Sequence, residues 1–151
     1  MEIDEVIIHP LYDDNDEWTN FDIALLKLKD SLDLEEFTPA CLPARNQTFV
    51  GETAWVYGWG YFENGNDDIS DILRQTTQRV IASDTCGKYW KDFTPAPNQL
   101  CAFGLGQDSC GGDSGGPLTV EENGRHILIG AVSFGAIPCA KVDISIYSVL
   151  H

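Results

Sequence analysis

The chain has 151 residues, enough for one domain with a substantial core. Hydrophobic residues make up 43% and aromatic residues 11% of it, which is typical of a globular protein rather than a disordered one. Its formal net charge of -15 argues against nucleic acid as a partner. No apolar run approaches the roughly 18 residues that a membrane-spanning helix needs, so we expect no membrane anchor.

Short apolar segments separated by turn residues predict an all-β protein, arranged as a barrel or a sandwich. In chain order, we expect strands at residues 5–8, 23–28, 54–57, 76–81, 116–120, 127–133 and 144–149. Residues 83–90 are predicted to form a short helix, with Ser83 or Asp84 as its N-cap. Residues 35–50, with Pro39, Pro43 and Asn46, are predicted to form a linker.

Residues 108–117, with the sequence DSCGGDSGGP, place Ser114 between glycines. A serine hydroxyl is a weak nucleophile until a base accepts its proton, and the oxyanion of acyl transfer needs fixed N–H donors about 3 Å away. The backbone amides of Gly112 and Ser114 are suited to supply those donors. A glycine-rich surface turn would explain a Ser-Gly-Gly triplet taken alone, so the flanking sequence decides.

Residues 111–118, GGDSGGPL, closely resemble the signature around the nucleophile of the chymotrypsin and trypsin family of serine peptidases. Residues 21–28, FDIALLKL, resemble the segment that carries the family's buried aspartate, and Asp22 is its counterpart. Further similar segments extend the resemblance over nearly all of the chain: Ala40-Cys41-Leu42-Pro43, Gly58-Trp59-Gly60, Ser133-Phe134-Gly135, Cys86, Cys101, Cys110 and Cys139.

The resemblance implies the trypsin-like serine protease fold, a double antiparallel β-barrel with the active site in the cleft between the barrels. It also implies that the chain is incomplete: residues 1–34 would be a remnant of the first barrel, 35–50 the linker, and 51–151 most of the second barrel. The family's catalytic histidine lies well before the aspartate, in an Ala-Ala-His-Cys segment that is missing here. His9, His126 and His151 lie in other contexts, so we expect this fragment alone to be inactive.

By the same resemblance, Ser114 is the nucleophile, Asp22 orients the missing histidine, and the Gly112 and Ser114 amides hold the oxyanion. The implied reaction is peptide-bond hydrolysis through an acyl-enzyme, with no metal or other cofactor. The alternative is a noncatalytic serine-peptidase homologue that acts as a binding or regulatory protein. Retention of Asp22, Asp108 and Ser114 together favours the enzyme.

Substrate preference is predicted from the pocket positions. Asp108 stands six residues before Ser114, where trypsin-like members keep a carboxylate that selects Arg or Lys in a protein or peptide substrate. A turn aspartate is the alternative for Asp108. Ser133-Phe134-Gly135 resembles the pocket wall, with Phe134 in place of the usual Trp. Ser145 stands where glycine is usual, so we expect a narrower pocket, and the choice between Arg and Lys stays open.

Five cysteines leave one without an internal partner. The family pattern implies the disulfides Cys86–Cys101 and Cys110–Cys139. Cys41 resembles the cysteine that tethers the catalytic domain to an upstream light chain or propeptide, and a buried free thiol is its alternative. This cysteine usage implies a secreted, extracellular zymogen, although the acidic first residues do not resemble an export signal.

Two further positions depart from the family pattern. Another family disulfide is lost as a pair, because Ala54 and Val120 occupy its expected positions. In the family, zymogen cleavage also exposes a terminal ammonium that pairs with the aspartate before the nucleophile, here Asp113. We therefore expect Asp113 to lack that ammonium partner and the surrounding site to be disordered or hydrated.

Overall fold

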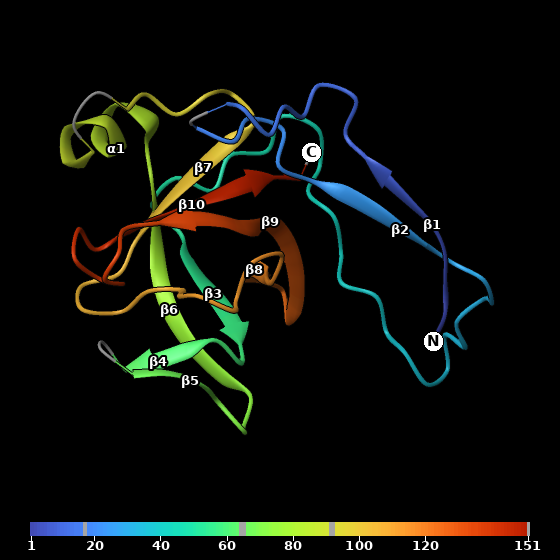
Figure 1. Cartoon of the computed structure of the whole chain (residues 1–151). Coiled ribbons are helices and arrows are strands. Elements are labelled where there is room, and N and C mark those ends of the chain that lie inside the picture. Colours follow the sequence, from blue (N-terminus) through green and yellow to red (C-terminus); the bar gives the residue numbers. More distant parts are fainter. Residues whose placement is uncertain (17, 64–65, 91–92, 151) are drawn as a thin grey trace.

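The computed structural model describes residues 1–16, 18–63, 66–90 and 93–150. These residues are mostly β-strand, with one short helix, as the sequence predicts (Figure 1). In chain order the elements are β1 (Ile3–Ile8), β2 (Ala24–Leu28), β3 (Thr53–Gly58), β4 (Tyr61–Glu63), β5 (Asn66–Ile69), β6 (Arg74–Ile81), α1 (Ser83–Tyr89), β7 (Gln99–Phe103), β8 (Pro117–Glu122), β9 (Arg125–Gly135) and β10 (Ile144–Val149). No helix in the described part of the chain is long and apolar enough to cross a membrane.

The central feature is a closed antiparallel barrel with the strand order β10-β7-β6-β3-β8-β9. Side chains alternate between its interior and its surface, because successive residues of a strand point to opposite faces. On β3, for example, Ala54 and Val56 are buried while Thr53 is exposed. In the part of the chain that the structure describes, the larger of two clusters of buried apolar residues consists of Phe49, Ala54, Val56, Val80, Ala102, Leu118, Val120, Ile127, Ile129, Val132 and Tyr147. The smaller one consists of Cys86, Phe93, Cys101, Ile144 and Ile146.

The strand β9 lies between β8 and β10 and reaches from one end of the barrel to the other. It follows β8 through a two-residue loop, Asn123-Gly124, in which both residues have positive φ, 53° and 73°. Such a loop matches the right-handed twist of the two strands it joins. The other end of β9, at Gly135, pairs with Ser145 of β10, so this strand links the hairpin loop to the predicted specificity pocket.

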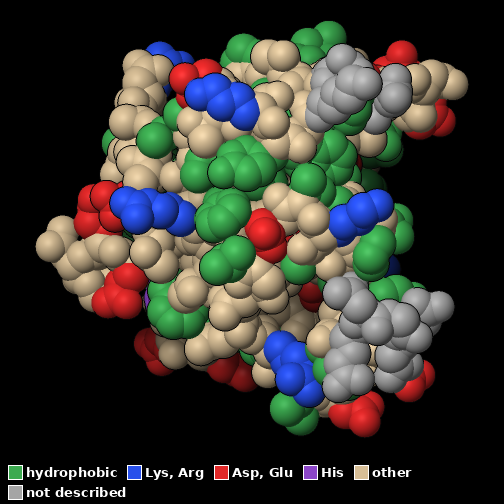
Figure 2. Space-filling model, turned by 90° about the vertical axis from the view of Figure 1, so that its left-hand side faces the viewer, with side chains coloured by type: hydrophobic (Ala, Val, Ile, Leu, Met, Phe, Trp, Pro, Cys, Tyr) green, Lys and Arg blue, Asp and Glu red, His purple; other side chains and the backbone are tan. Residues whose placement is uncertain are grey.

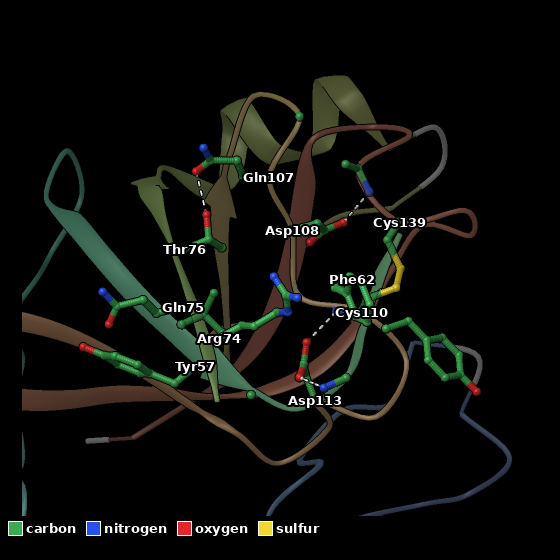
Figure 3. A pocket seen from close by; sticks show the side chains of 16 residues that line it. Tyr57, Phe62, Arg74, Gln75, Thr76, Gln107, Asp108, Cys110, Asp113 and Cys139 are labelled. Carbon is green, nitrogen blue, oxygen red and sulfur yellow. Dashed lines mark hydrogen bonds between the residues drawn. A yellow bond between two sulfur atoms is a disulfide. The ribbon is translucent and has the colours of Figure 1, made fainter. Parts of the chain in front are cut away.

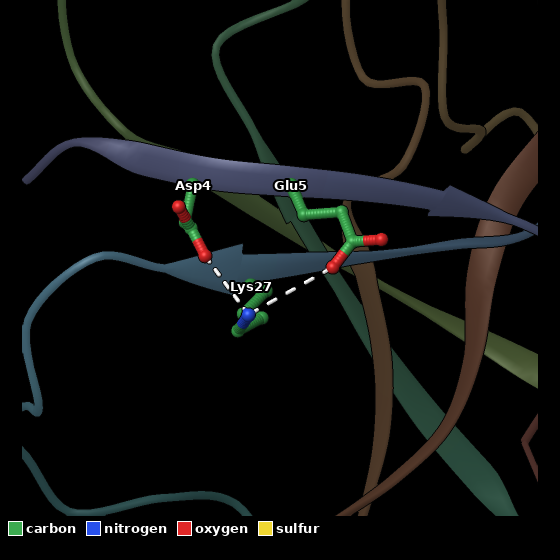
Figure 4. A network of polar contacts seen from close by, with 3 residues as sticks. All are labelled: Asp4, Glu5 and Lys27. Carbon is green, nitrogen blue, oxygen red and sulfur yellow. Dashed lines mark ion pairs between the residues drawn. The ribbon is translucent and has the colours of Figure 1, made fainter.

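The strands β1 and β2 form a separate two-stranded sheet outside the barrel (Figure 1). Lys27 of β2 lies 2.9 Å from Asp4 and 3.8 Å from Glu5 of β1 (Figure 4), but exposed ion pairs of this kind contribute little stability. The apolar side chains of the hairpin are also exposed, namely Ile3, Val6, Ile7, Ile8, Leu25 and Leu26. The hairpin therefore buries little apolar surface within the chain itself.

The helix α1 begins as predicted at Ser83, but the predicted N-cap is wrong. The N-cap is Ala82, which makes no side-chain capping hydrogen bond. Its carbonyl accepts the N–H groups of Thr85 and Cys86, both at 3.0 Å. Asp84 lies within the first turn, where its negative charge favours the helix dipole. A disulfide between Cys86 and Cys101 joins this short helix to β7, so the helix is held by a covalent link rather than by a cap.

The sequence analysis missed β4, β5 and β7. In β7 the buried residues are Gln99, Cys101 and Ala102, so polar and small side chains hide the alternation that marks a half-buried strand. The strand is nevertheless indispensable, because it closes the barrel between β6 and β10.

Ala54 and Val120, where a family disulfide is absent, lie directly opposite each other on β3 and β8. Both are buried, at 0% and 4% exposure. An apolar contact inside the barrel therefore occupies the place of the implied disulfide, and no cysteine is left unpaired by its loss.

We expect the double variant Ala54→Cys, Val120→Cys to form a disulfide, because facing residues in an antiparallel pair have Cβ atoms only about 4.5–5.5 Å apart. Closing the long loop between them is expected to raise the free energy of unfolding by about 4 kcal/mol in the chain-entropy model. Denaturant unfolding of the oxidised double variant, compared with each oxidised single variant, measures the gain. Two free thiols in the folded double variant would contradict this expectation.

Candidate active site

Ser114 is exposed in the turn that precedes β8. Backbone hydrogen bonds fix this turn after the serine. The N–H of Gly115 donates to the carbonyl of Val132 on β9 at 2.9 Å, and the N–H of Gly116 donates to the carbonyl of Asp113 at 2.8 Å. The serine hydroxyl is thus held at the surface on a backbone that is anchored to the barrel.

The two amides expected to hold an oxyanion are open. Within the described residues, neither the N–H of Gly112 nor that of Ser114 donates a hydrogen bond to the protein. Gly112 has a φ of +95°, a conformation that favours glycine, and a Cβ there would lie 3.1 Å from the Cα of Gly60. The conformation that leaves these donors free therefore depends on a glycine at position 112.

Asp113 is half-buried, and both of its carboxylate oxygens accept backbone N–H groups. Its Oδ1 accepts the N–H of Gly60 at 2.7 Å, and its Oδ2 accepts the N–H of Cys110 at 2.9 Å. A Cβ at Gly60 would lie 2.6 Å from the Cγ of Asp113, so only glycine leaves room for this carboxylate. Backbone N–H groups supply the stabilisation that we expected a counter-charge to provide.

Asp22 is half-buried and is attached to two strands of the barrel. Its Oδ2 accepts the hydroxyl of Ser133 on β9 at 2.7 Å, and its backbone carbonyl accepts the hydroxyl of Ser148 on β10 at 2.7 Å. The residue before Ser133, Val132, holds the turn of Ser114. Consecutive residues of β9 therefore bring Asp22 and the serine turn to the same end of the barrel.

The segment before Asp22 packs against the expected pocket wall through aromatic rings. The ring of Trp18 lies 4.8 Å from that of Phe93 and 6.4 Å from that of Phe134, measured between ring centroids. The side chain of Gln99 also donates to the carbonyl of Trp18 at 2.6 Å. The sequence analysis missed Trp18, Phe93 and Gln99, because they lie outside the family motifs.

Neither histidine in the described part of the chain forms a hydrogen bond or an ion pair with Asp22. The ring of His9 is stacked on Phe21 with centroids 4.7 Å apart, and its Nδ1 accepts the N–H of Leu11. The Nδ1 of His126 lies 3.3 Å from the hydroxyl of Thr119, in the β8–β9 hairpin. His151 lies outside the described residues. No three His, Cys, Asp or Glu side chains within those residues are grouped as a metal ion would require.

Asp108 lies beside the residues expected to form the primary pocket. Its Oδ2 accepts the N–H of Ala140 at 2.8 Å, and its Oδ1 accepts the hydroxyl of Ser145, which is fully buried. A Cβ on Gly135 would lie 3.9 Å from Oδ2, so the end of β9 is close to the carboxylate. The two hydrogen bonds join Asp108 to β10 and to the loop that precedes it.

The two implied disulfides both form. Cys110–Cys139 joins the loop that carries Asp108 to the loop before β10, and Cys86–Cys101 joins α1 to β7. Phe134, in the expected pocket wall, faces Ile146 across the β9–β10 pair. Cys41 is a free thiol of intermediate exposure.

The sequence analysis also missed Gln78 on β6, which is 2% exposed. Its Nε2 donates to the Ser145 hydroxyl at 2.8 Å, and its Oε1 accepts the hydroxyl of Tyr147 at 2.5 Å. One signal was present, since Gln78 shares a strand face with Val80 and a polar group that faces the core needs hydrogen-bond partners. Those partners, however, lie on β10 and could not be named from the sequence.

A cavity of about 280 Å³ lies beside both Asp108 and Asp113, bounded by β3, β6 and the loops at residues 106–113 and 139–140. Figure 3 shows Arg74, Asp108 and Asp113 around this space. The guanidinium of Arg74 lies 4.2 Å above the ring of Phe62, and its Nε donates to Ser70 at 2.9 Å. The carboxylates of Asp108 and Asp113 therefore both border this one cavity.

The face that carries α1 and the loop between β9 and β10 presents grouped apolar side chains with scattered charges (Figure 2). Exposed apolar residues of the neighbouring loops include Leu105, at 78%, and Ile137, at 90%. A mixed surface of this kind suits contact with an extended peptide better than with a phosphate backbone.

An exposed serine turn and an aspartate are both anchored to one strand of an antiparallel barrel, and comparisons with known proteins show which family has this arrangement of the chain. The family model described as Trypsin matches residues 1–150. Venom serine protease 34 of Apis mellifera is 38% identical over 146 residues, which are 92% of this chain and 35% of that protein. The fold matches neuropsin, a serine protease expressed in the limbic system of mouse brain, with a TM-score of 0.86 and 28% identity, over 99% of this chain and 66% of the solved chain.

This chain belongs to the trypsin family of serine proteases. The resemblance found in the sequence and the predicted trypsin-like fold are thereby confirmed. The chain spans 35% of the length of the venom protease that it matches.

Burial in the barrel raises the pKa of the Tyr147 phenol far above its ordinary value. The phenol therefore ionises more easily in the unfolded chain than in the folded one. Its contribution to the free energy of unfolding is fully present below the ordinary pKa of about 10 and is lost as the pH rises above that value. We expect an absorbance titration to show one phenol that ionises together with alkaline unfolding, and Tyr147→Phe to remove that step. Tyr89→Phe, which removes an exposed phenol, is the control. If the late ionisation persists in Tyr147→Phe, it belongs to another tyrosine.

Proposed function

We propose that this chain is part of a secreted, trypsin-like serine endopeptidase that hydrolyses peptide bonds after Lys or Arg through an acyl-enzyme. The observation that carries the proposal is the arrangement around the end of β9. There, Val132 holds the turn of Ser114, Ser133 binds Asp22, and Gly135 borders Asp108. One short segment thus positions a nucleophile, an orienting carboxylate and a charged pocket.

In this proposal the Ser114 Oγ attacks the scissile carbonyl, and the open N–H groups of Gly112 and Ser114 stabilise the oxyanion that forms. A histidine accepts the serine proton and later donates it to the leaving amine. Asp22 orients that histidine through the carboxylate oxygen that does not bind Ser133. Water then hydrolyses the acyl-enzyme, with no metal or cofactor required.

The histidine belongs, in this proposal, to a part of the whole protein outside this chain. Residues 1–34 are then the end of a first barrel, residues 35–50 a linker, and residues 51–151 most of the second barrel. Two observations support this division. The chain covers 66% of the neuropsin structure and 35% of the venom protease. The β1–β2 hairpin also exposes apolar side chains that further strands of a first barrel would cover.

We further propose that substrates are proteins or peptides with Lys or Arg at the cleavage site. The support is Asp108, whose half-buried carboxylate binds no positively charged side chain among the described residues. A cationic substrate side chain would supply the missing charge, and neutral side chains would leave the carboxylate uncompensated.

Activation of a zymogen by cleavage is also proposed. The support is the cavity beside Asp113, which has room for a newly formed ammonium terminus. Each carboxylate oxygen of Asp113 already accepts one backbone N–H, and each has a further lone pair for the ammonium. The two disulfides and the venom relative support secretion from the cell.

Cys41 is proposed to form a disulfide with an upstream chain. Its backbone is held against β9, because its N–H donates to the carbonyl of His126 at 2.9 Å and its carbonyl accepts the N–H of Leu128 at 2.8 Å. Cys41 is a free cysteine of intermediate exposure that packs against the edge of the core. Its backbone position is therefore fixed, as a tether requires.

We expect the whole protein, after activation, to hydrolyse Lys and Arg amide substrates and to be labelled by a fluorophosphonate. Ser114→Ala is expected to abolish the labelling and to lower kcat by at least about 10⁴-fold, since it removes the nucleophile. Ser31→Ala, at an exposed serine of the N-terminal segment, is the control. If the activated protein is neither labelled nor active, it is a noncatalytic homologue.

We expect gel electrophoresis of the activated protein to show one band without reductant and two bands with it. Cys41→Ser should give two bands under both conditions, because the tether is lost while the two internal disulfides remain. A Cys41→Ser protein that still migrates as one unreduced band would place the link at another cysteine, and a single band under reduction would show that no chain had been cleaved.

A further inference from the structure

We propose that Gln78 and Ser145 determine the specificity of the primary pocket: together they occupy acceptor positions of Asp108, so that the pocket prefers the ammonium of Lys to the guanidinium of Arg. The inference rests on the proposed function, since it assumes that Asp108 receives the substrate side chain. It goes beyond that function by naming the preferred substrate and the buried residue that sets the preference.

The first step is a count of acceptor positions on the Asp108 carboxylate. An ionised carboxylate offers about four lone-pair sites. On Oδ1, one site accepts the Ser145 hydroxyl and a second faces the Nε2 of Gln78 at 3.4 Å. Gln78 has two N–H groups: one donates to Ser145 at 2.8 Å, and the other is shared between this Oδ1 and the Gln107 carbonyl at 3.3 Å. On Oδ2, one site accepts the N–H of Ala140 at 2.8 Å. The remaining open site is therefore on Oδ2.

The second step compares the two cationic side chains. Arginine binds a carboxylate best through two parallel N–H groups, one to each oxygen. Because Ser145 and Gln78 already lie against Oδ1, an arginine could not place its second N–H group on that oxygen. Lysine carries a compact ammonium that needs only one carboxylate site and has further N–H groups to place. The Ser145 hydroxyl donates to Asp108 and accepts from Gln78, so it stays engaged with the protein while the ammonium uses the open site on Oδ2.

The third step is that Gln78 holds this arrangement in one orientation. Its NH₂ group faces the carbonyl of Gln107 at 3.3 Å and the carboxylate of Asp108, which only accept hydrogen bonds. Its Oε1 must then face Tyr147, whose hydroxyl donates to it. A flipped amide would place its oxygen against those two acceptors. The Ser145 hydroxyl is therefore directed at Asp108 and away from Gln78.

The network is also rigid. Gln78 is 2% exposed and Ser145 is fully buried, so displacing Ser145 from Asp108 would leave a buried hydroxyl proton without its acceptor. Gly104 makes room for the glutamine, because a Cβ there would lie 2.9 Å from the Cγ of Gln78. An incoming substrate thus meets a carboxylate whose occupied positions are already set.

The test compares kcat/KM for matched Lys and Arg amide substrates in the activated whole protein. We expect Lys to be preferred by about tenfold. Ser145→Gly should shift the Lys/Arg ratio toward Arg by at least about tenfold, since it frees an acceptor site and removes the side chain. Ser145→Ala keeps the Cβ but removes the hydroxyl, so it separates the lost hydrogen bond from the lost bulk. If the hydrogen bond sets the preference, Ser145→Ala should give most of the shift that Ser145→Gly gives.

Gln78→Met tests the positioning role, because methionine is similar in shape but cannot hydrogen-bond as an amide does. We expect it to shift the Lys/Arg ratio toward Arg, since it leaves one acceptor site of Oδ1 open and no longer directs the Ser145 hydroxyl. Gln99→Met is the matched control, because Gln99 is also buried, at 6% exposure, and binds Trp18 rather than Asp108. Equal ratios in the two variants would mean that Gln78 is merely structural.

Direct binding separates this inference from the proposed function. Benzylamine and benzamidine share one ring and differ in carrying an ammonium or a forked amidinium. Titration calorimetry should show a benzylamine/benzamidine affinity ratio that falls by about tenfold in Ser145→Gly. If the protein hydrolyses substrates but this ratio is unchanged, the inference fails and the function stands. If it binds with the expected shift but hydrolyses nothing, the function fails and the pocket assignment stands.

Discussion

The interaction on which the rest of the structure depends is the pairing of β9 with both of its neighbours in a closed barrel. Its first part, residues 125–131, pairs with β8 and its last part, residues 130–135, pairs with β10, so that Gly130 and Ala131 are paired on both sides. A closed barrel has no edge at which a strand could slip, so the residues at the end of β9 keep fixed positions. Val132, Ser133 and Gly135 then act on three different parts of the site without any flexible connection between them.

Three carboxylates at this end of the barrel are held in the same way. Asp22 accepts from a serine hydroxyl, Asp113 from two backbone N–H groups, and Asp108 from a hydroxyl and a backbone N–H. Neutral donors orient a carboxylate without cancelling its charge. In the proposed enzyme each anion receives a separate cation: a protonated histidine, a terminal ammonium and a substrate side chain. In this proposal the barrel therefore supplies the carboxylate of each of three ion pairs.

Disulfides and apolar contacts hold the segments that lie outside the paired strands. Cys110–Cys139 joins the loop of Asp108 to the loop before β10, where no ladder connects them. Rings of Trp18, Phe93 and Phe134 attach the segment before Asp22 to the barrel. The β1–β2 hairpin has no comparable packing, and its apolar side chains stay exposed. The site residues are therefore held by the barrel, whereas the hairpin needs another surface to cover its apolar side chains.

The sequence by itself determined the family and the β-rich fold, because they follow from short local motifs and from apolar patterns along the chain. Through the family resemblance it also predicted the two disulfides, and it nominated Ser114, Asp22 and Asp108 as site positions. The strands with clear apolar alternation were predictable for the same reason, whereas β7 was not, since Gln99 and Cys101 obscure its pattern. Only the tertiary structure decided what surrounds those motifs. Gly60 and Asp113 are 53 residues apart, and Gln78 and Ser145 are 67 apart. Such pairs meet only once the barrel closes, so no local pattern could show that Asp113 has donors or that Gln78 reaches the pocket.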